Sequence, residues 1–337
     1  MRKHKANLFV QSALAAFACV GASAQEGAPN GEWLTWGGDA GHTRYSALDQ
    51  ITLDNVDQLE IAWRWAVPPP GDRPASNFKS TPLMHDGVLY VPSGAFGASA
   101  IDAGTGETIW NYAPPEKEGG GGRGASLSSR ALTMWIDGES VRLIHSTEDG
   151  RLISIDAATG EADPDFGEGG IVDLSLPASD GGEPLGVRVV SPAVVVGDVI
   201  VSSVIPGQVR DRDVAAPGFI RGFDVHTGEQ LWTFHTIPQE GEFGVDTWEN
   251  ESWRISSAAG AWTMMTADPE TGYVYIGTET ANDDGSAGAE FYAGNRPGDN
   301  LFAESIVCLD SATGERVWHF QIVHHGIWDY DMPAAPI

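Results

Sequence analysis

Apolar and polar positions follow one phrase that recurs along the chain. An apolar run ends at an Asp, the polar turn Asp-x-x-Thr-Gly-Glu follows, and a second run leads away to a Trp. Full copies occupy 102–110, 224–232 and 310–318, and a weaker copy at 156–161 keeps the turn without the Trp. The Asp side chain can accept a backbone N–H within such a turn, and Gly tolerates a positive φ. Each copy therefore predicts a β-hairpin.

Recurring hairpins indicate a repeat architecture. A lone hairpin cannot bury an indole ring, so we expect each Trp to wedge against the next unit. The copies lie further apart than the roughly 40–50 residues of a four-stranded blade, which indicates long loops on one face. A further upstream unit is expected around 59–65. These features favour an all-β chain folded as a β-propeller over the alternative, a β-sandwich with chance similarities.

The first residues are typical of an export signal. Positions 1–5 are mostly basic, an apolar stretch follows, and Ala22-Ser-Ala24 offers the small residues of a cleavage site. We expect a signal peptide over 1–24, a propeller domain over 25–337 and a periplasmic or secreted location. Cys19 leaves a lipidation site open as an alternative. The apolar stretch is too short for a membrane span, and no other segment predicts one.

Charge and cysteine content narrow the possible partners. The chain carries 47 acidic and 19 basic residues and a formal net charge of −28. Nucleic acid and anionic membrane surfaces are poor partners for such a surface. Of the two Cys residues, only Cys308 lies beyond the predicted signal, so no internal disulfide is expected. Cys308 falls in a predicted strand, where we expect it to be buried.

Two further segments extend the pattern of the repeats. They are Trp33-Leu-Thr-Trp-Gly-Gly-Asp-Ala-Gly-His-Thr-Arg-Tyr-Ser46 and His324-His-Gly-Ile-Trp-Asp-Tyr-Asp-Met-Pro-Ala-Ala-Pro336. Read with the repeats, they resemble the dehydrogenases that depend on pyrroloquinoline quinone (PQQ), the quinoprotein alcohol and glucose dehydrogenases. The resemblance implies an eight-bladed propeller of the quinoprotein type. Only four to five blade units can be counted, so we expect a partial chain, roughly the first half of such a propeller.

The resemblance implies that Asp329 is the catalytic base and also contacts the metal. Oxidation of an alcohol requires removal of its hydroxyl proton, which a positioned carboxylate can accept. Asp331 lies two residues on, and in an extended segment both carboxylates would face the same side. Two carboxylates suit Ca²⁺ or another hard cation, with a lanthanide as an alternative. The alternative roles are a turn-forming Asp329 and a solvated Asp331.

The cofactor contacts are likewise implied by the resemblance. Trp262 is expected to form the aromatic floor under PQQ, unless it is simply a core Trp. Arg123 follows a Gly run and is expected to bind a PQQ carboxylate through its guanidinium fork, the alternative being a surface charge. Ser128 stands five residues on, where the glucose enzymes carry a His, and is taken as a further cofactor contact.

Two further metal ligands depart from the family pattern. Asp213 falls where the family places a Glu ligand and has a shorter side chain. Thr280 occupies the position of an Asn ligand, and a hydroxyl is the weaker neutral ligand. Asn282 is close enough in sequence to substitute for it. The adjacent His324 and His325 would point to opposite faces of a strand, so they do not predict a shared metal.

The function predicted from these features is periplasmic oxidation of an alcohol or an aldose sugar, with hydride transfer to PQQ. Cytochrome c or a membrane quinone would accept the electrons. The alternative is a non-catalytic propeller scaffold of the outer-membrane assembly lipoprotein type, since the fold alone does not define the function. The sequence has no Gly-x-Gly-x-x-Gly segment leading from a strand into a helix, which disfavours a nicotinamide enzyme. It also lacks the HExxH motif that would indicate a zinc site.

Overall fold

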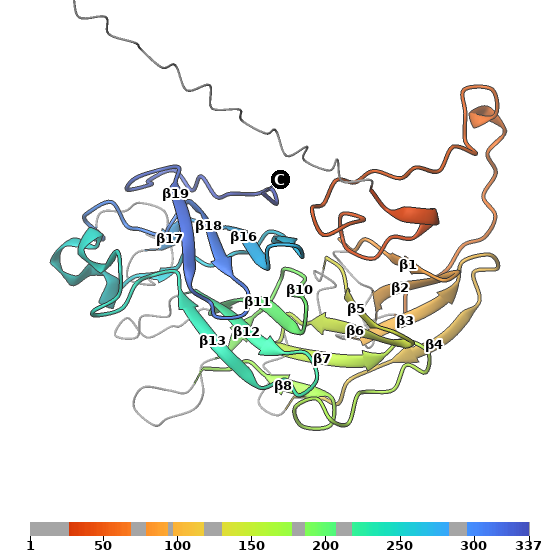
Figure 1. Cartoon of the computed structure of the whole chain (residues 1–337), viewed down its shortest axis with the longest axis horizontal. Helices are drawn as coiled ribbons and strands as arrows, with labels where there is room; N and C mark the ends of the chain where they lie inside the picture. Colours follow the sequence, from red (N-terminus) through yellow and green to blue (C-terminus); the bar gives the residue numbers. More distant parts are fainter. Residues whose placement is uncertain are drawn as a thin grey trace, which may run out of the picture.

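The computed structural model describes residues 27–68, 79–93, 97–117, 130–176, 186–206, 218–282 and 295–336. Across these residues, antiparallel sheets fan out side by side in an arc (Figure 1). Four of the sheets have the order of propeller blades, in which each strand pairs with its neighbour in sequence. The prediction of an all-β propeller with four to five blades is confirmed, with four blades in the described part of the chain.

Each blade is a run of consecutive strands. The first contains β1 (Leu83–His85), β2 (Val88–Ser93), β3 (Gly97–Asp102) and β4 (Thr108–Tyr112). The second contains β5 (Thr133–Asp137), β6 (Ser140–Ser146), β7 (Arg151–Asp156) and β8 (Ile171–Asp173). The third contains β10 (Val194–Val196), β11 (Val199–Pro206), β12 (Phe219–Asp224) and β13 (Gln230–His235), with β9 (Val187–Arg188) paired to β11. The fourth contains β15 (Thr266–Asp268), β16 (Tyr273–Gly277), β18 (Ser305–Asp310) and β19 (Arg316–Gln321).

The remaining elements are short. β14 (Ser257–Ala258) pairs with β17 (Ala281–Asn282) beside the fourth blade. The 3₁₀ turns are η1 (Pro29–Gly31), η2 (Val56–Gln58), η3 (Val245–Thr247) and η4 (Glu249–Arg254). Within the described ranges, no helix is long and apolar enough to cross a membrane.

The repeated turns have the predicted chemistry. The carboxylates of Asp102, Asp156, Asp224 and Asp310 each accept the N–H of the Thr three residues on, at 2.7–3.0 Å. The following Gly has a φ of 71–75° in every copy. Three copies join two strands of a hairpin, as predicted, whereas the turn after β7 is followed by a longer connection to β8. The same turn recurs at 268–272 between β15 and β16, where no Trp marks it.

The repeat Trp residues wedge between neighbouring blades, as predicted. The Nε1 of Trp110 in β4 donates to the Ala157 carbonyl of the second blade at 3.0 Å, and its ring covers Gly160. Trp232 in β13 docks in the same way on the turn of the fourth blade. Trp318 in β19 has no such partner among the described residues, and its side chain is 42% exposed.

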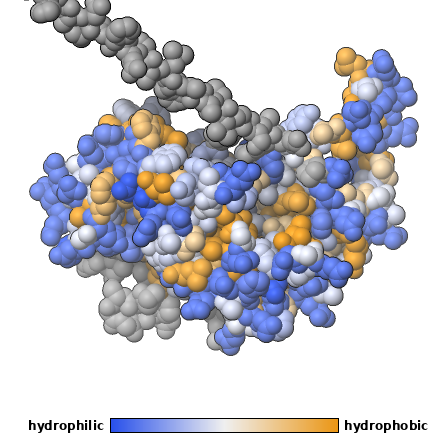
Figure 2. Space-filling model, in the orientation of Figure 1, coloured by the Kyte–Doolittle hydropathy of each residue, from blue (hydrophilic) through white to orange (hydrophobic). Residues whose placement is uncertain are grey.

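The upstream unit expected around 59–65 is not a blade. Residues 59–68 form no strand, although Trp63 docks on the first blade by donating to the Ala103 carbonyl at 3.0 Å. Its ring covers Gly106 as Trp110 covers Gly160. The segment therefore contributes a docked Trp, as the outer strands of the blades do, without forming a strand itself. Residues before it project from the arc as an arm in which Leu53 is 95% exposed (Figures 1 and 2).

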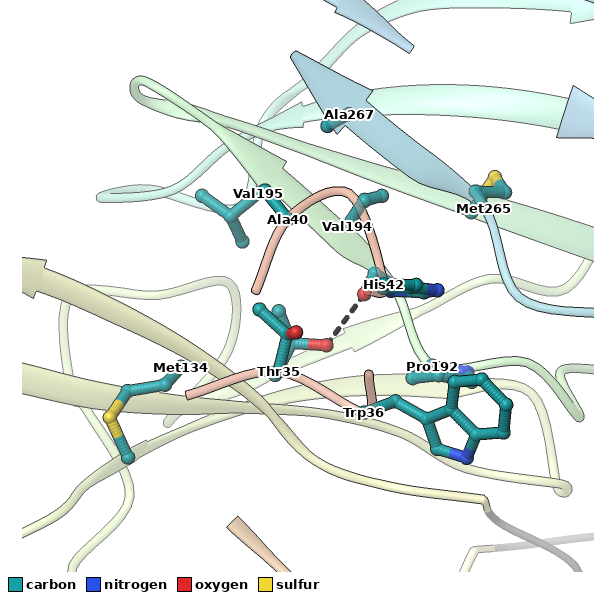
Figure 3. Close-up of a pocket in the computed structure, with 12 residues that line it drawn as sticks. Thr35, Trp36, Ala40, His42, Met134, Pro192, Val194, Val195, Met265 and Ala267 are labelled. Atoms are coloured by element: carbon teal, nitrogen blue, oxygen red, sulfur yellow. Dashed lines mark hydrogen bonds between the residues drawn. The ribbon is translucent and has the colours of Figure 1, made fainter. Parts of the chain in front are cut away.

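The segment 33–44 joins the blades on their inner side. Trp33 exchanges backbone hydrogen bonds with Met84 of β1, and the carbonyl of Ala40 accepts the N–H of Ala267 of β15. A small cavity lies between this segment and the inner strands (Figure 3). Its lining includes His42, which is 7% exposed and has its ring 5.4 Å from that of Trp36. The segment thus links the first blade to the fourth.

Candidate functional site

The candidate site lies at the fourth blade, where three connecting segments meet. Trp262 precedes β15, Thr280 precedes β17, and the segment 327–331 follows β19. Trp262 is half-buried and Thr280 is buried, whereas Asp329 is exposed. The site is therefore built from loops of one blade, held by the strands that they connect.

Asp331 is the centre of the arrangement. Its Oδ2 accepts the indole Nε1–H of Trp262 at 2.7 Å, and its Oδ1 accepts the backbone N–H of Thr280 at 2.8 Å. The structure thus brings three of the predicted site residues into direct contact. Both carboxylate oxygens have protein donors, so the alternative of a solvated loop charge does not describe Asp331.

Asp329 carries a raised pKa. Partial burial raises it first, and the charge of Asp331 and a hydrogen bond between the two carboxyl groups raise it further. The carboxyl groups of Asp329 and Asp331 do lie together, but the segment between them is not extended as expected. Asp329 has φ +58°, in the left-handed region, so the chain turns there and is not a strand. The carboxyl groups meet because of that turn.

Glu279 is a site residue that the sequence analysis missed. It is half-buried, and its Oε1 accepts the N–H of Gly260, two residues before Trp262, at 3.2 Å. Burial raises the pKa of Glu279 to about 8, with the charges of Asp331 and Asp329 adding to the effect. An acidic side chain beside Thr280 was the available signal, but it lies outside any repeat.

Arg130 is a second residue that the sequence analysis missed. Its guanidinium lies 5.0 Å from the Trp262 ring centroid and donates to the Trp262 carbonyl at 2.5 Å. It also donates to the Val190 carbonyl at 3.2 Å, and burial lowers its pKa. The signal that could have found it is a single Arg before the apolar pair Ala131-Leu132 that leads into β5.

Three predicted residues lie outside the described ranges: Arg123, Ser128 and Asp213. Their roles stay predictions. Asn282, the suggested substitute for Thr280, lies in β17, where it pairs with Ser257. Of the two adjacent His residues, His325 contacts the Gly298 carbonyl at 2.8 Å and His324 lies 3.6 Å from Asp299.

The donor chemistry around Trp262 fits the groups that the resemblance implies. Burial raises the pKa of Glu279 and of Asp329, and the like charges near them raise it further. A hard cation among these carboxylates would relieve that repulsion. Among the described residues, no group of three or more Asp, Glu, His or Cys side chains is arranged to hold a metal ion. The half-buried Trp262 indole, with a guanidinium 5.0 Å from its ring centroid, suits a flat, anionic ring system.

The fold and this site define a propeller in which Trp262 contacts Asp331 beside the carboxyl group of Asp329, and comparison with known proteins gives the family. Residues 33–337 match the family model described as "PQQ: Glucose/ethanol/alcohol dehydrogenase, beta-propeller domain". The chain belongs to this family of PQQ-dependent dehydrogenases.

Individual relatives agree with that assignment. The chain is 32% identical over 315 residues to the glycerol dehydrogenase large subunit of Gluconobacter oxydans (strain 621H), covering 90% of this chain and 40% of that protein. It is 30% identical to the dehydrogenase subunit of the quinone alcohol dehydrogenase of the same organism, covering 91% and 40%. The chain thus spans about 40% of the length of these curated relatives.

Solved structures show the same fold. The quinohemoprotein alcohol dehydrogenase of Comamonas testosteroni superposes with a TM-score of 0.71 at 28% identity, covering 90% of this chain and 43% of that one. A europium-containing methanol dehydrogenase superposes with a TM-score of 0.68 at 22% identity, covering 89% and 50%. The second likeness concerns the fold alone.

Proposed function

We propose that this chain carries the cofactor site of a PQQ-dependent dehydrogenase that oxidises alcohols. The observation that carries the proposal is the contact of Asp331 with both Trp262 and Thr280, beside the carboxyl group of Asp329. Family membership supports the cofactor, and the alcohol and glycerol dehydrogenases among the relatives support the substrate class. A non-catalytic scaffold has no need of this arrangement.

Trp262 and Arg130 would hold the cofactor. The indole offers a flat apolar face, and Asp331 fixes its orientation through the Nε1–H. The Arg130 guanidinium lies beside that face and can pair with a carboxylate of the cofactor. Arg123 would bind a second carboxylate, and Ser128 would add a polar contact.

Asp329 would act as the general base. Its carboxylate can take the hydroxyl proton of the alcohol at an Oδ atom, and its raised pKa makes it a stronger base than an ordinary Asp. Its exposed position leaves it accessible to substrate. When bound there, PQQ would supply the hydride acceptor for the alcohol carbon, and a cation would supply Lewis-acid activation.

Asp329, Asp331, Thr280 and Asp213 would hold that cation. Carboxylate and hydroxyl oxygens suit Ca²⁺ or another hard cation, and a lanthanide is the alternative. The basic and apolar start of the chain supports export to the periplasm, where cytochrome c or a membrane quinone would accept the electrons. An aldose sugar is the second substrate class to test.

The test is reconstitution of the chain with PQQ and Ca²⁺, followed by dye reduction with ethanol, glycerol, methanol and glucose. We expect reduction with at least one alcohol. Asp329→Asn should still bind PQQ but lose roughly 10²–10⁴-fold in kcat. Asp246→Asn, an exposed acidic residue of η3, is the matched control and should keep full activity. Normal turnover by Asp329→Asn would remove Asp329 as the base.

A further inference from the structure

Two fully buried charged side chains lie behind the segment that bears Asp329. Arg296 and Glu304 both have 0% exposure. Burial raises the pKa of Glu304, the charge of Asp331 adds to that effect, and the Arg296 guanidinium opposes it. A buried charge costs free energy, so its presence calls for a structural or functional reason.

Both side chains converge on Gly326. The Nη2 of Arg296 donates to the Gly326 carbonyl at 2.5 Å. The Glu304 carboxyl group fills the space where a side chain at position 326 would begin, so a Cβ there would collide with it. Asn300 holds Arg296 in place through two hydrogen bonds of 2.7 and 3.0 Å. Gly326, which directly precedes the segment 327–331 that bears Asp329, is thereby held in place.

Glu304 also reaches the other end of the segment. Its Oε1 accepts the hydroxyl of Thr280 at 3.0 Å, and the N–H of Thr280 binds Asp331. The backbone N–H of Tyr330 lies close enough to lower the pKa of Glu304 as a hydrogen-bond donor. Glu304 therefore contacts the chain on both sides of Asp329, at Gly326 and at Tyr330.

We propose that Arg296 and Glu304 are positioning residues that hold Asp329 and Asp331 in register with Trp262. The left-handed backbone of Asp329 persists only if its surroundings fix it, and this pair supplies fixed points on both sides. The proposal rests on the proposed function of Asp329, but the anchoring itself is a property of the chain without cofactor.

The first test measures hydrogen exchange of residues 323–333 by mass spectrometry, without PQQ or metal. The double variant Arg296→Met/Glu304→Met removes both charges at similar volume, a type of replacement that buried pairs often tolerate. We expect exchange there to rise at least about tenfold while the blade strands stay protected. The matched control is Arg142→Met/Asp163→Met, which removes the 2.8 Å ion pair of the second blade and should leave 323–333 unchanged.

A second pair of variants decides the matter if the double variant fails to fold. Thr280→Val keeps the N–H that binds Asp331 but loses the hydroxyl that binds Glu304, whereas Thr280→Ser keeps both. We expect faster exchange at 323–333 in Thr280→Val and normal exchange in Thr280→Ser. Unchanged exchange in Thr280→Val, or in a folded double variant, would overturn the proposal.

The active enzyme offers an independent readout. Loss of positioning should lower kcat of the folded Arg296→Met/Glu304→Met variant by about tenfold or more with KM nearly unchanged, whereas Arg142→Met/Asp163→Met should keep its kcat. If no variant, including the unmodified chain, reduces dye, then the proposed function fails while the exchange result still stands. The two hypotheses are therefore tested separately.

Discussion

At the residue scale, the carboxylates around Trp262 behave as a coupled group. The pKa of Glu279 is about 8 and that of Asp329 is also raised, so both retain protons more strongly than ordinary acids. Cation binding must displace those protons. We expect Ca²⁺ affinity to rise by up to tenfold per pH unit up to about pH 8, and the dependence to be weaker in Glu279→Gln. Calorimetric titrations at several pH values would measure it, and a flat profile in the unmodified chain would contradict the coupling.

The raised pKa of Glu279 also predicts how the stability of the cation-free chain depends on pH. Because the folded pKa of Glu279 lies above its unfolded value, the folded state binds more protons between about pH 4.5 and pH 8. Stability must therefore fall as pH rises through this window. Glu279→Gln should remove that loss and raise the free energy of unfolding at pH 8.5 by roughly 2–4 kcal/mol, with little gain at pH 4.5. Denaturant titrations at both pH values provide the measurement.

The sequence predicted part of this site. Trp262, Thr280 and Asp331 meet as their family positions imply, because each is fixed by a motif beside a strand. Glu279 and Arg130 were missed because an isolated charge gives no periodic signal, and its burial depends on distant segments. The left-handed turn at Asp329 was missed for a related reason: Asp tolerates this conformation but signals it only weakly in a sequence that contains many Asp residues.

At the element scale, each docked Trp depends on a Gly of the next turn. Gly160 has φ +75° in a turn that the Trp110 ring covers, while Gly138 has φ +59° in open space. Gly160→Ala should cost roughly 2–4 kcal/mol, from the backbone and from the displaced ring, whereas Gly138→Ala should cost about 1 kcal/mol. Thermal unfolding of both variants tests this, and equal costs would mean that the docked ring is not tightly packed.

The hairpins were predictable because their chemistry is local. The Asp-x-x-Thr-Gly turn specifies its own hydrogen bonds, and it was recognised where Glu followed the Gly, even without a Trp at 156–161. The turn at 268–272 has the same bonds, but Tyr273 follows its Gly and no Trp marks it, so it escaped notice. The segment 59–65 shows the opposite error: its Trp63 docks like the others, but its backbone pairs with no described strand. Strand pairing depends on residues far away in sequence, which a local pattern does not contain.

At the scale of the whole molecule, the blades form an arc whose two ends bear exposed apolar side chains. Leu59 and Ile61 are 60% and 65% exposed at one end, and Phe320 and Trp328 are 64% and 68% exposed at the other. Within the arc, Trp wedges connect neighbouring blades, and the inner segment 33–44 links the first blade to the fourth. The order of the blades follows from the repeat, but the role of segment 33–44 could not be predicted, since the contacts by which it joins blades are with strands far away in sequence.

His42 makes that inner segment sensitive to acid. Burial lowers its pKa to about 4, so the folded chain keeps the imidazole neutral while the unfolded chain protonates it below about pH 6.5. The unfolded state then binds more protons between pH 6.5 and pH 4, and stability must fall as pH falls through this window. His42→Phe keeps a ring beside Trp36 but does not titrate, so it should abolish a loss of roughly 2–3 kcal/mol between pH 7 and pH 4.5.

The matched control for this prediction is His226→Phe. The ring of His226 also packs against an indole, that of Trp135, at 5.1 Å between centroids, but the His226 side chain is 47% exposed. Its replacement should leave the acid dependence of unfolding intact. If both variants flatten the profile equally, the acid sensitivity is not specific to segment 33–44. If neither does, His42 is protonated without disturbing the contacts that join the first blade to the fourth.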